Sequence, residues 1–138
     1  CNCCGLISVD TDLITKIIKF ENELGKKIKI SNSTRCKKHN AQVGGSAKST
    51  HLEISTAIDF EVEGLTIDEV IMTAREIFGG IGAYYNLSNK HIFYHVDTRA
   101  KKLLWHKVKK YVYFDFKDYE KLIDGFKAEI EKINEVKK

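Results

Sequence analysis

Three side chains that could bind a metal ion lie on separate segments of the chain, namely His51, Asp59 and His95. Two imidazoles and one carboxylate are the ligands expected for a zinc ion that keeps a further position for a water molecule. A fold that uses them must bring a loop and two strands together at one point. Because an open coordination position is typical of catalytic zinc, this set indicates a hydrolase.

Each of these candidates also has a purely structural alternative. His51 follows a loop, residues 44–50, from which an imidazole can reach a cleft, and by itself it would be a surface histidine. Asp59 lies in an otherwise apolar strand, where a carboxylate needs a metal ion, a cap or a salt bridge as partner. His95 taken alone would be a hydrogen-bonded core histidine. The presence of all three on one chain favours the metal site.

Length and composition predict one domain. The 138 residues are 43% hydrophobic, which is enough for a single core. No apolar run approaches the roughly 20 residues that span a bilayer, and the first residues are not a signal peptide. The net charge of +4 comes with lysines crowded into 101–110 and the C-terminal tail. Such a surface favours an anionic polymer as partner, or is simply a solvated helix face.

Hydrophobic periodicity predicts an α+β fold in which a small antiparallel sheet is flanked by helices. An N-cap signal opens the first helix, and Thr66 with Glu69 has the spacing of a capping box. The last two predicted strands form a hairpin, whereas the segment 101–115 is ambiguous. The predicted helices cover about 10–25, 66–78 and 117–137, and the predicted strands cover 28–31, 56–62, 83–86 and 91–98.

An ordered succession of short motifs runs from about Cys3 to about Arg99. It comprises Ser31–Cys36, His39-Asn40, Val43–Gly45, Ser49–His51, Ala57–Asp59, Gly80–Tyr85 and His95–Arg99. This succession resembles the zinc D-Ala-D-Ala carboxypeptidase family, which shares one metallopeptidase fold group with lysostaphin-type peptidases and the hedgehog signalling domain. The resemblance implies a single zinc peptidase domain over residues 1–138. Its motif-bearing region is about 3–99, and 100–138 is a C-terminal extension that packs on it.

The resemblance also implies a cofactor and a substrate. The cofactor is Zn²⁺, held by His51, Asp59 and His95, and the substrates are the stem peptides of bacterial peptidoglycan. A zinc-activated water would remove a terminal D-Ala or cut a stem or cross-link bond. We expect a monomer without a nucleic-acid partner or a membrane span. The site of action would be the bacterial wall, whether the protein is cellular or encoded by a phage.

Further residues receive roles from the matching motifs. Arg35 corresponds to the family arginine, whose planar fork could bind a substrate carboxylate or stabilise an oxyanion; a surface salt bridge is the alternative. Ser49 could contact substrate or form a turn. Tyr84 could line the substrate cleft, although an aromatic residue in a strand is more often part of the core.

The proton-transfer residue is less closely defined, because many family members carry a Glu where this chain has Ile92. Asp97 and His91 are then the candidates, since alternation in the strand places both on the face of His95. Asp97, within the family's His-Val-Asp motif, is the better candidate. It would act as a general base, or it would orient His95 or pair with Arg99.

One departure from the family pattern concerns the first two ligands. The separation between His51 and Asp59 is one residue longer than in the usual His-x-x-Gly-x-Ala-x-Asp pattern, and the Gly is missing. Since an extra residue in a regular strand reverses the face of a side chain, it must be absorbed in a bulge or in the loop before Thr56. Otherwise Glu53 would substitute for Asp59. A catalytically inactive, zinc-stabilised binding domain is therefore the alternative function.

The cysteines receive no catalytic role. Three of them lie within Cys1–Cys4 and the fourth is Cys36, which follows the motif arginine. The resemblance allows a structural link between Cys36 and the N-terminal group, and buried thiols are the alternative.

Overall fold

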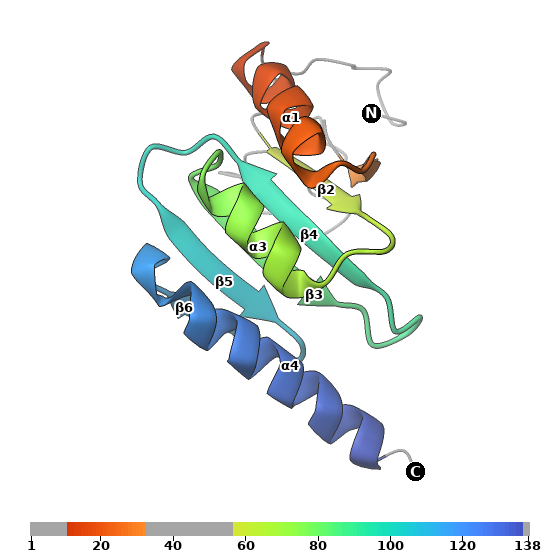
Figure 1. Ribbon diagram of the computed structural model, residues 1–138. Helices are drawn as coiled ribbons and strands as arrows, with labels where there is room; N and C mark the ends of the chain where they lie inside the picture. The colour runs from red at the N-terminus through yellow and green to blue at the C-terminus, as the bar shows by residue number, and fades with distance from the viewer. Residues whose placement is uncertain (1–10, 33–56, 137–138) are drawn as a thin grey trace, which may run out of the picture.

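The computed structural model of the chain describes residues 11–32 and 57–136. Its helices are α1 (Thr11–Leu24), α3 (Ile67–Arg75) and α4 (Tyr119–Val136), and a short 3-10 helix, η1 (Phe116–Asp118), precedes α4. Its strands are β1 (Lys29–Asn32), β2 (Ala57–Glu61), β3 (Gly80–Tyr85), β4 (Ile92–Asp97), β5 (Leu103–Lys107) and β6 (Tyr111–Phe114). The predicted α+β class is confirmed (Figure 1).

The strands form one six-stranded sheet in the order β1-β2-β4-β3-β5-β6. All neighbouring pairs are antiparallel except β3 and β5, which are parallel. The ambiguous segment 101–115 supplies β5 and β6, so the sheet is wider than the predicted strands alone would make it. The chain after β4 thus returns to pair with β3 and extends the sheet on that side.

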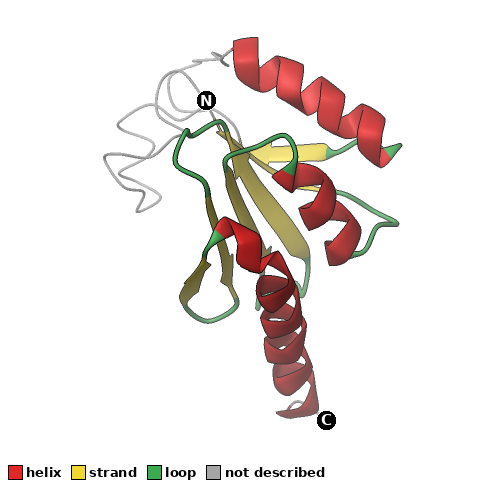
Figure 2. Ribbon diagram, turned by 60° about the vertical axis from the view of Figure 1, so that its left-hand side comes forward, coloured by secondary structure: helices red, strands yellow, loops and turns green. Residues whose placement is uncertain are grey.

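The three helices lie on one side of the sheet (Figure 2). Phe20 of α1 packs edge-on against Phe60 of β2 and against Phe78, with 5.5 Å between ring centroids in each case. On the sheet, the core consists of alternate residues of the four central strands: Ile58, Phe60, Tyr94, Val96, Ile81, Ala83, Tyr85 and Leu104. Because side chains alternate along a strand, the residues between these point to the other face.

Local signals set the bounds of the elements. Gly25, at φ +70°, ends α1 as predicted, and its amide donates to the Glu21 carbonyl at 2.9 Å. Thr66 caps α3, because its hydroxyl oxygen accepts a hydrogen bond from the Glu69 amide at 3.3 Å. Helix α3 ends at Arg75, three residues before the predicted end at Phe78, which lets the Phe78 ring enter the core.

The hairpin of β3 and β4 is also confirmed. Its turn is stabilised by the Asn86 side chain, whose oxygen accepts from the Ser88 amide at 2.9 Å. Lys90 adopts the left-handed conformation, at φ 62°, before the chain enters β4. Among the helices that the structure describes, none combines the length and the apolar character needed to cross a membrane.

Candidate metal centre

The face of the sheet opposite the helices carries the candidate site. The strand register places five residues in one row across the sheet: Asp59 of β2, His95 of β4, Gly82 of β3, Trp105 of β5 and Tyr113 of β6. Residues paired in this way point to the same face. Two predicted metal ligands, Asp59 and His95, are therefore direct cross-strand neighbours.

The imidazole of His95 lies between two carboxylates. Its Nδ1 is 3.0 Å from Asp59 Oδ1, and its Nε2 is 2.7 Å from Asp97 Oδ2. His95 is 6% exposed and Asp97 is fully buried. Burial by itself would lower the pKa of His95, but the hydrogen bonds and charges of Asp59 and Asp97 raise it. The ring is thus held in one orientation by partners on both sides.

Asp97 is also held by Arg99. The guanidinium donates from Nε to Asp97 Oδ1 at 2.9 Å and from Nη2 to Oδ2 at 2.7 Å, and the Arg99 amide donates to Oδ1 at 3.1 Å. Burial would raise the pKa of Asp97, yet the hydrogen bonds from His95 and Arg99 hold it well below its usual range. Asp97 therefore remains a carboxylate and can only accept hydrogen bonds.

This arrangement suits a cation between Asp59 and His95. In the neutral imidazole, Nε2 carries the proton and donates it in a hydrogen bond to Asp97, and Nδ1 then presents a lone pair toward the Asp59 carboxylate. Two acceptors 3.0 Å apart need a proton or a metal ion between them. Nitrogen and carboxylate oxygen are ligands that zinc accepts, and a carboxylate on the far nitrogen is its usual support. Within residues 11–32 and 57–136 no group of three or more potential ligands occurs, and His51 lies outside them.

Two glycines of β3 make room for the site. A Cβ on Gly80 would overlap the Asp97 carboxylate, and one on Gly82 would overlap the Trp105 indole. Because Gly82 has no side chain, Trp105 reaches across β3 toward His95, with 5.2 Å between the ring centroids. The Arg99 guanidinium lies 5.0 Å from the Trp105 ring centroid.

Tyr84 lies beside this group. Its hydroxyl oxygen accepts a hydrogen bond from Trp105 Nε1 at 2.8 Å, and burial raises the pKa of the phenol. The Tyr84 ring stacks on Phe93 at 4.8 Å between centroids. The structure thus places Tyr84 on the face of the site, in contact with the indole that packs on His95.

Of the remaining predicted residues, only His91 is described by the structure, and it lies away from His95. His91 precedes β4 and is exposed, with its Nδ1 3.4 Å from a Glu61 carboxylate oxygen. It lies four positions before His95, which corresponds to about 13 Å along the strand. Arg35, Ser49 and His51 lie outside the residues that the structure describes, as do Glu53 and the four cysteines.

The longer separation between His51 and Asp59 leaves no irregularity within β2. From Ala57 to Phe60, β2 pairs with β4 in unbroken register, and Asp59 points to the face of His95. A register shift does occur in β1, between Ile30 and Asn32, opposite this part of β2. The residues from 51 to 56, where the loop could absorb an extra position, lie outside the described part.

The role of Trp105 was not predicted from the sequence. It follows the last matching motif and lies in the segment whose secondary structure was ambiguous. The sequence did contain a signal for its orientation, since alternation over 103–107 would make Trp105 and Leu104 point to opposite faces of a strand. The sequence does not show which strand lies beside β5, so it could not place the indole against His95.

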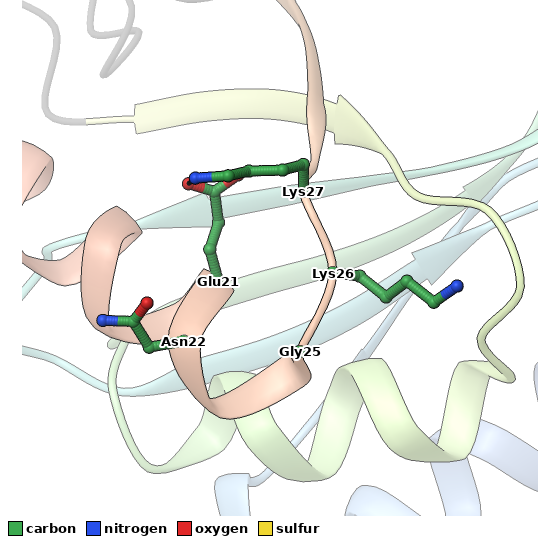
Figure 3. A pocket seen from close by; sticks show the side chains of 5 residues that line it. All are labelled: Glu21, Asn22, Gly25, Lys26 and Lys27. Carbon is green, nitrogen blue, oxygen red and sulfur yellow. Dashed lines mark ion pairs between the residues drawn. The ribbon is translucent and has the colours of Figure 1, made fainter.

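A hollow of about 240 Å³ lies elsewhere, where α1 ends and the chain turns toward β1 (Figure 3). Its polar groups form a hydrogen bond and an ion pair within the turn. The Glu21 carboxylate accepts from the Ile28 amide at 3.0 Å and lies 3.6 Å from the Lys27 ammonium. The hollow is lined by Glu21, Asn22, Gly25, Lys26 and Lys27. None of these is a predicted site residue, and we assign this hollow no function.

Comparison with known proteins gives one match. A protein-family model described as peptidase M15 matches residues 3–97. The match includes β1 to β4, and with them Asp59, His95 and Asp97, and it ends at Asp97 before β5 begins. No match was found among curated proteins or solved structures.

Proposed function

The chain belongs to the peptidase M15 family, and from this premise we propose that it is a zinc-dependent peptidase acting on the stem peptides of peptidoglycan. The observation that carries the proposal is the distance of 3.0 Å between Asp59 Oδ1 and His95 Nδ1, on residues of the matching motifs. We assign His51 as the third ligand from its place in the motif order. The substrate class rests on the family resemblance.

The residues around His95 would prepare it to bind metal. Asp97 accepts a hydrogen bond from the Nε2–H group, which leaves the Nδ1 lone pair for the ion and fixes the plane of the ring. Arg99 holds Asp97 through both carboxylate oxygens, and Gly80 leaves the space that this carboxylate occupies. A zinc ion bound there would polarise the scissile carbonyl and lower the pKa of a bound water.

The position of Asp97 favours an orienting role over that of a general base. Both of its oxygens accept hydrogen bonds, and the side chain is fully buried. A general base needs access to the attacking water and a pKa near the working pH, whereas the pKa of Asp97 is held low. His91 lies too far along the strand to act beside His95. Arg35 is proposed to bind the substrate carboxylate or the oxyanion, and Ser49 and Tyr84 to line the substrate site.

A zinc-stabilised domain without catalysis is the second candidate function. The observation that favours it is Ile92, half-exposed at the strand position where many family members carry a catalytic Glu. Both candidates require bound zinc. They differ in whether purified wall material is cleaved.

Metal analysis and wall digestion test the two candidates together. We expect one zinc per wild-type chain after extensive dialysis, and wall peptides with new termini identified by mass spectrometry. His95→Ala should lose most of the zinc, because a site with three protein ligands loses much of its affinity with one of them.

His91→Ala is the matched control, since it removes an exposed histidine away from the site and should retain the metal. Full zinc content in His95→Ala would refute the metal site. Zinc binding without any cleavage of wall material would establish the non-catalytic alternative instead.

A further inference from the structure

The face of the sheet that carries the candidate metal centre continues into a set of aromatic rings in contact with one another, which we call the aromatic surface; it runs from the buried Trp105 to two exposed tyrosines. Tyr113 is 60% exposed and Tyr111 is 47% exposed, although large aromatic side chains are usually more buried. The aromatic surface consists of Phe93 on β4, Tyr84 on β3, Trp105 on β5, and Tyr111 and Tyr113 on β6. Exposed apolar groups gathered in this way mark an interaction site.

The rings of the aromatic surface contact one another in sequence. Tyr84 stacks on Phe93 and meets Tyr111 edge-on at 6.1 Å between centroids. Tyr111 and Tyr113 are nearly parallel at 6.1 Å, and Tyr113 lies 6.4 Å from Trp105. Trp105 in turn packs on His95. The aromatic surface is therefore continuous with the metal centre.

The charges on this face help to identify the partner. The Arg99 guanidinium is already paired with the buried Asp97, and Lys107 lies 4.8 Å from the Tyr111 ring centroid. The next lysines, Lys109 and Lys110, belong to the turn between β5 and β6, so the positive charge gathers at one end of the rings. At the other end lies the Asp59 carboxylate. The rings between these ends carry only hydroxyl and indole groups.

We propose that the aromatic surface binds the glycan strand of peptidoglycan beside the peptide that enters the metal centre; this inference rests on the proposed function. A sugar ring presents C–H groups on its faces, which the negative face of an aromatic ring attracts, and hydroxyls on its rim. Tyrosine hydroxyls at the edges of the surface can bond those hydroxyls. Because stem peptides are attached to glycan, a peptide at the metal centre brings its sugar chain close to this sheet face.

A single-stranded nucleic acid is the competing partner with a similar need for aromatic rings. Proteins that bind single-stranded nucleic acids combine stacking side chains with a positively charged groove that follows the phosphates. Here the lysines cluster at the β5–β6 turn, and a carboxylate lies at the opposite end of the row. This distribution of charge favours a partner that is neutral along the rings.

The test uses Trp105 as a reporter, since it is the only tryptophan in the sequence. The probe is a chito-oligosaccharide, because this oligomer of β-1,4-linked N-acetylglucosamine has the sugar backbone of the glycan strand and carries no charge. We expect saturable changes in tryptophan emission on titration. Tyr113→Ala should weaken binding about tenfold, whereas Tyr113→Phe, which keeps the ring, should stay within about threefold of wild type.

Met72→Ala is the matched control, because Met72 is 51% exposed on α3, across the sheet from the aromatic surface. It should bind glycan as the wild type does. Tyr111→Ala gives a second, independent variant, and circular dichroism checks that each variant is folded.

Three results would overturn the inference. They are the absence of saturable binding, wild-type affinity in both folded alanine variants, and tighter binding of a single-stranded oligonucleotide than of glycan. Hydrolysis of a soluble stem peptide by the wild-type protein is measured separately. Glycan binding without hydrolysis would refute the proposed function and leave the aromatic surface standing, and hydrolysis without glycan binding would do the reverse.

Discussion

At the scale of single residues, Asp97 shows how burial changes the meaning of a motif. Within a His-Val-Asp sequence, a carboxylate can be a base, a ligand or a support for the histidine. The structure buries it completely and gives both of its oxygens to His95 and Arg99. A carboxylate enclosed in this way orients the histidine, because it has no direct contact with solvent and hence none with an attacking water.

Replacement of Asp97 by Asn tests this role. The amide lacks the charge that pairs with Arg99 and holds the His95 proton, so we expect zinc affinity to fall about 10- to 100-fold, with turnover falling as well. A competition titration with a chelator measures the affinity. A variant that loses turnover while its zinc affinity remains that of the wild type would show that Asp97 acts as the base.

At the scale of elements, β3 determines how much space is left for the side chains of the neighbouring strands β4 and β5. Its glycines on the site's face, Gly80 and Gly82, have no side chains, so the side chains of β4 and β5 lean across it. Asp97 occupies the space above Gly80, and Trp105 occupies that above Gly82. A strand in the middle of the sheet thus serves the site by leaving room for groups from both sides.

Replacement of Gly82 by Ala should displace Trp105. The new methyl group would overlap the indole, and we expect a loss of stability of about 1–3 kcal/mol, together with changed tryptophan emission. Urea denaturation followed by circular dichroism measures the first effect.

The control is Gly125→Ala in α4, where a Cβ would have His106 Nε2 as its nearest neighbour at 3.4 Å. This change should stabilise the helix by about 0.5–1 kcal/mol. Wild-type stability and emission in Gly82→Ala would contradict the packing described above.

At the scale of the whole molecule, the sheet separates two environments with different chemistry. One face carries the candidate metal centre, and the other forms the apolar core with the helices. His106 of β5 belongs to the core side, 2% exposed, with ring centroids of Phe114 and Phe126 at 5.3 and 5.8 Å. Within the described part of the chain, its Nδ1 has no hydrogen-bond partner.

This buried histidine should make stability depend on pH. Burial lowers the pKa of His106, and the charge of Glu129, which acts in the opposite direction, does not offset it. Below about pH 6.5 the unfolded chain therefore binds a proton that the folded chain does not, and stability decreases as pH falls.

His106→Leu should remove this contribution and flatten the decrease in unfolding free energy between pH 7 and 5. Urea denaturation at several pH values measures it. If the unfolding free energy decreased equally with pH in the wild type and in His106→Leu, His106 would not contribute to the pH dependence of stability.

Much of this protein could be predicted from local sequence patterns. The helical period, the caps at Thr66 and Gly25, and the alternation around Asp59 and His95 depend on neighbouring residues, and the structure confirms those elements. The motif order also predicted the family that the match over residues 3–97 shows. These features follow from the chain itself, because backbone geometry relates residues a few positions apart.

Tertiary structure decided the rest. Which strand lies beside β5, and hence that Trp105 reaches His95, depends on pairing between segments far apart in the sequence. The burial of Asp97 and the distance of His91 from the site have the same origin, since both depend on where β4 lies in the sheet. A strand pattern specifies which side chains share a face, whereas the fold of the whole chain decides which strands that face adjoins.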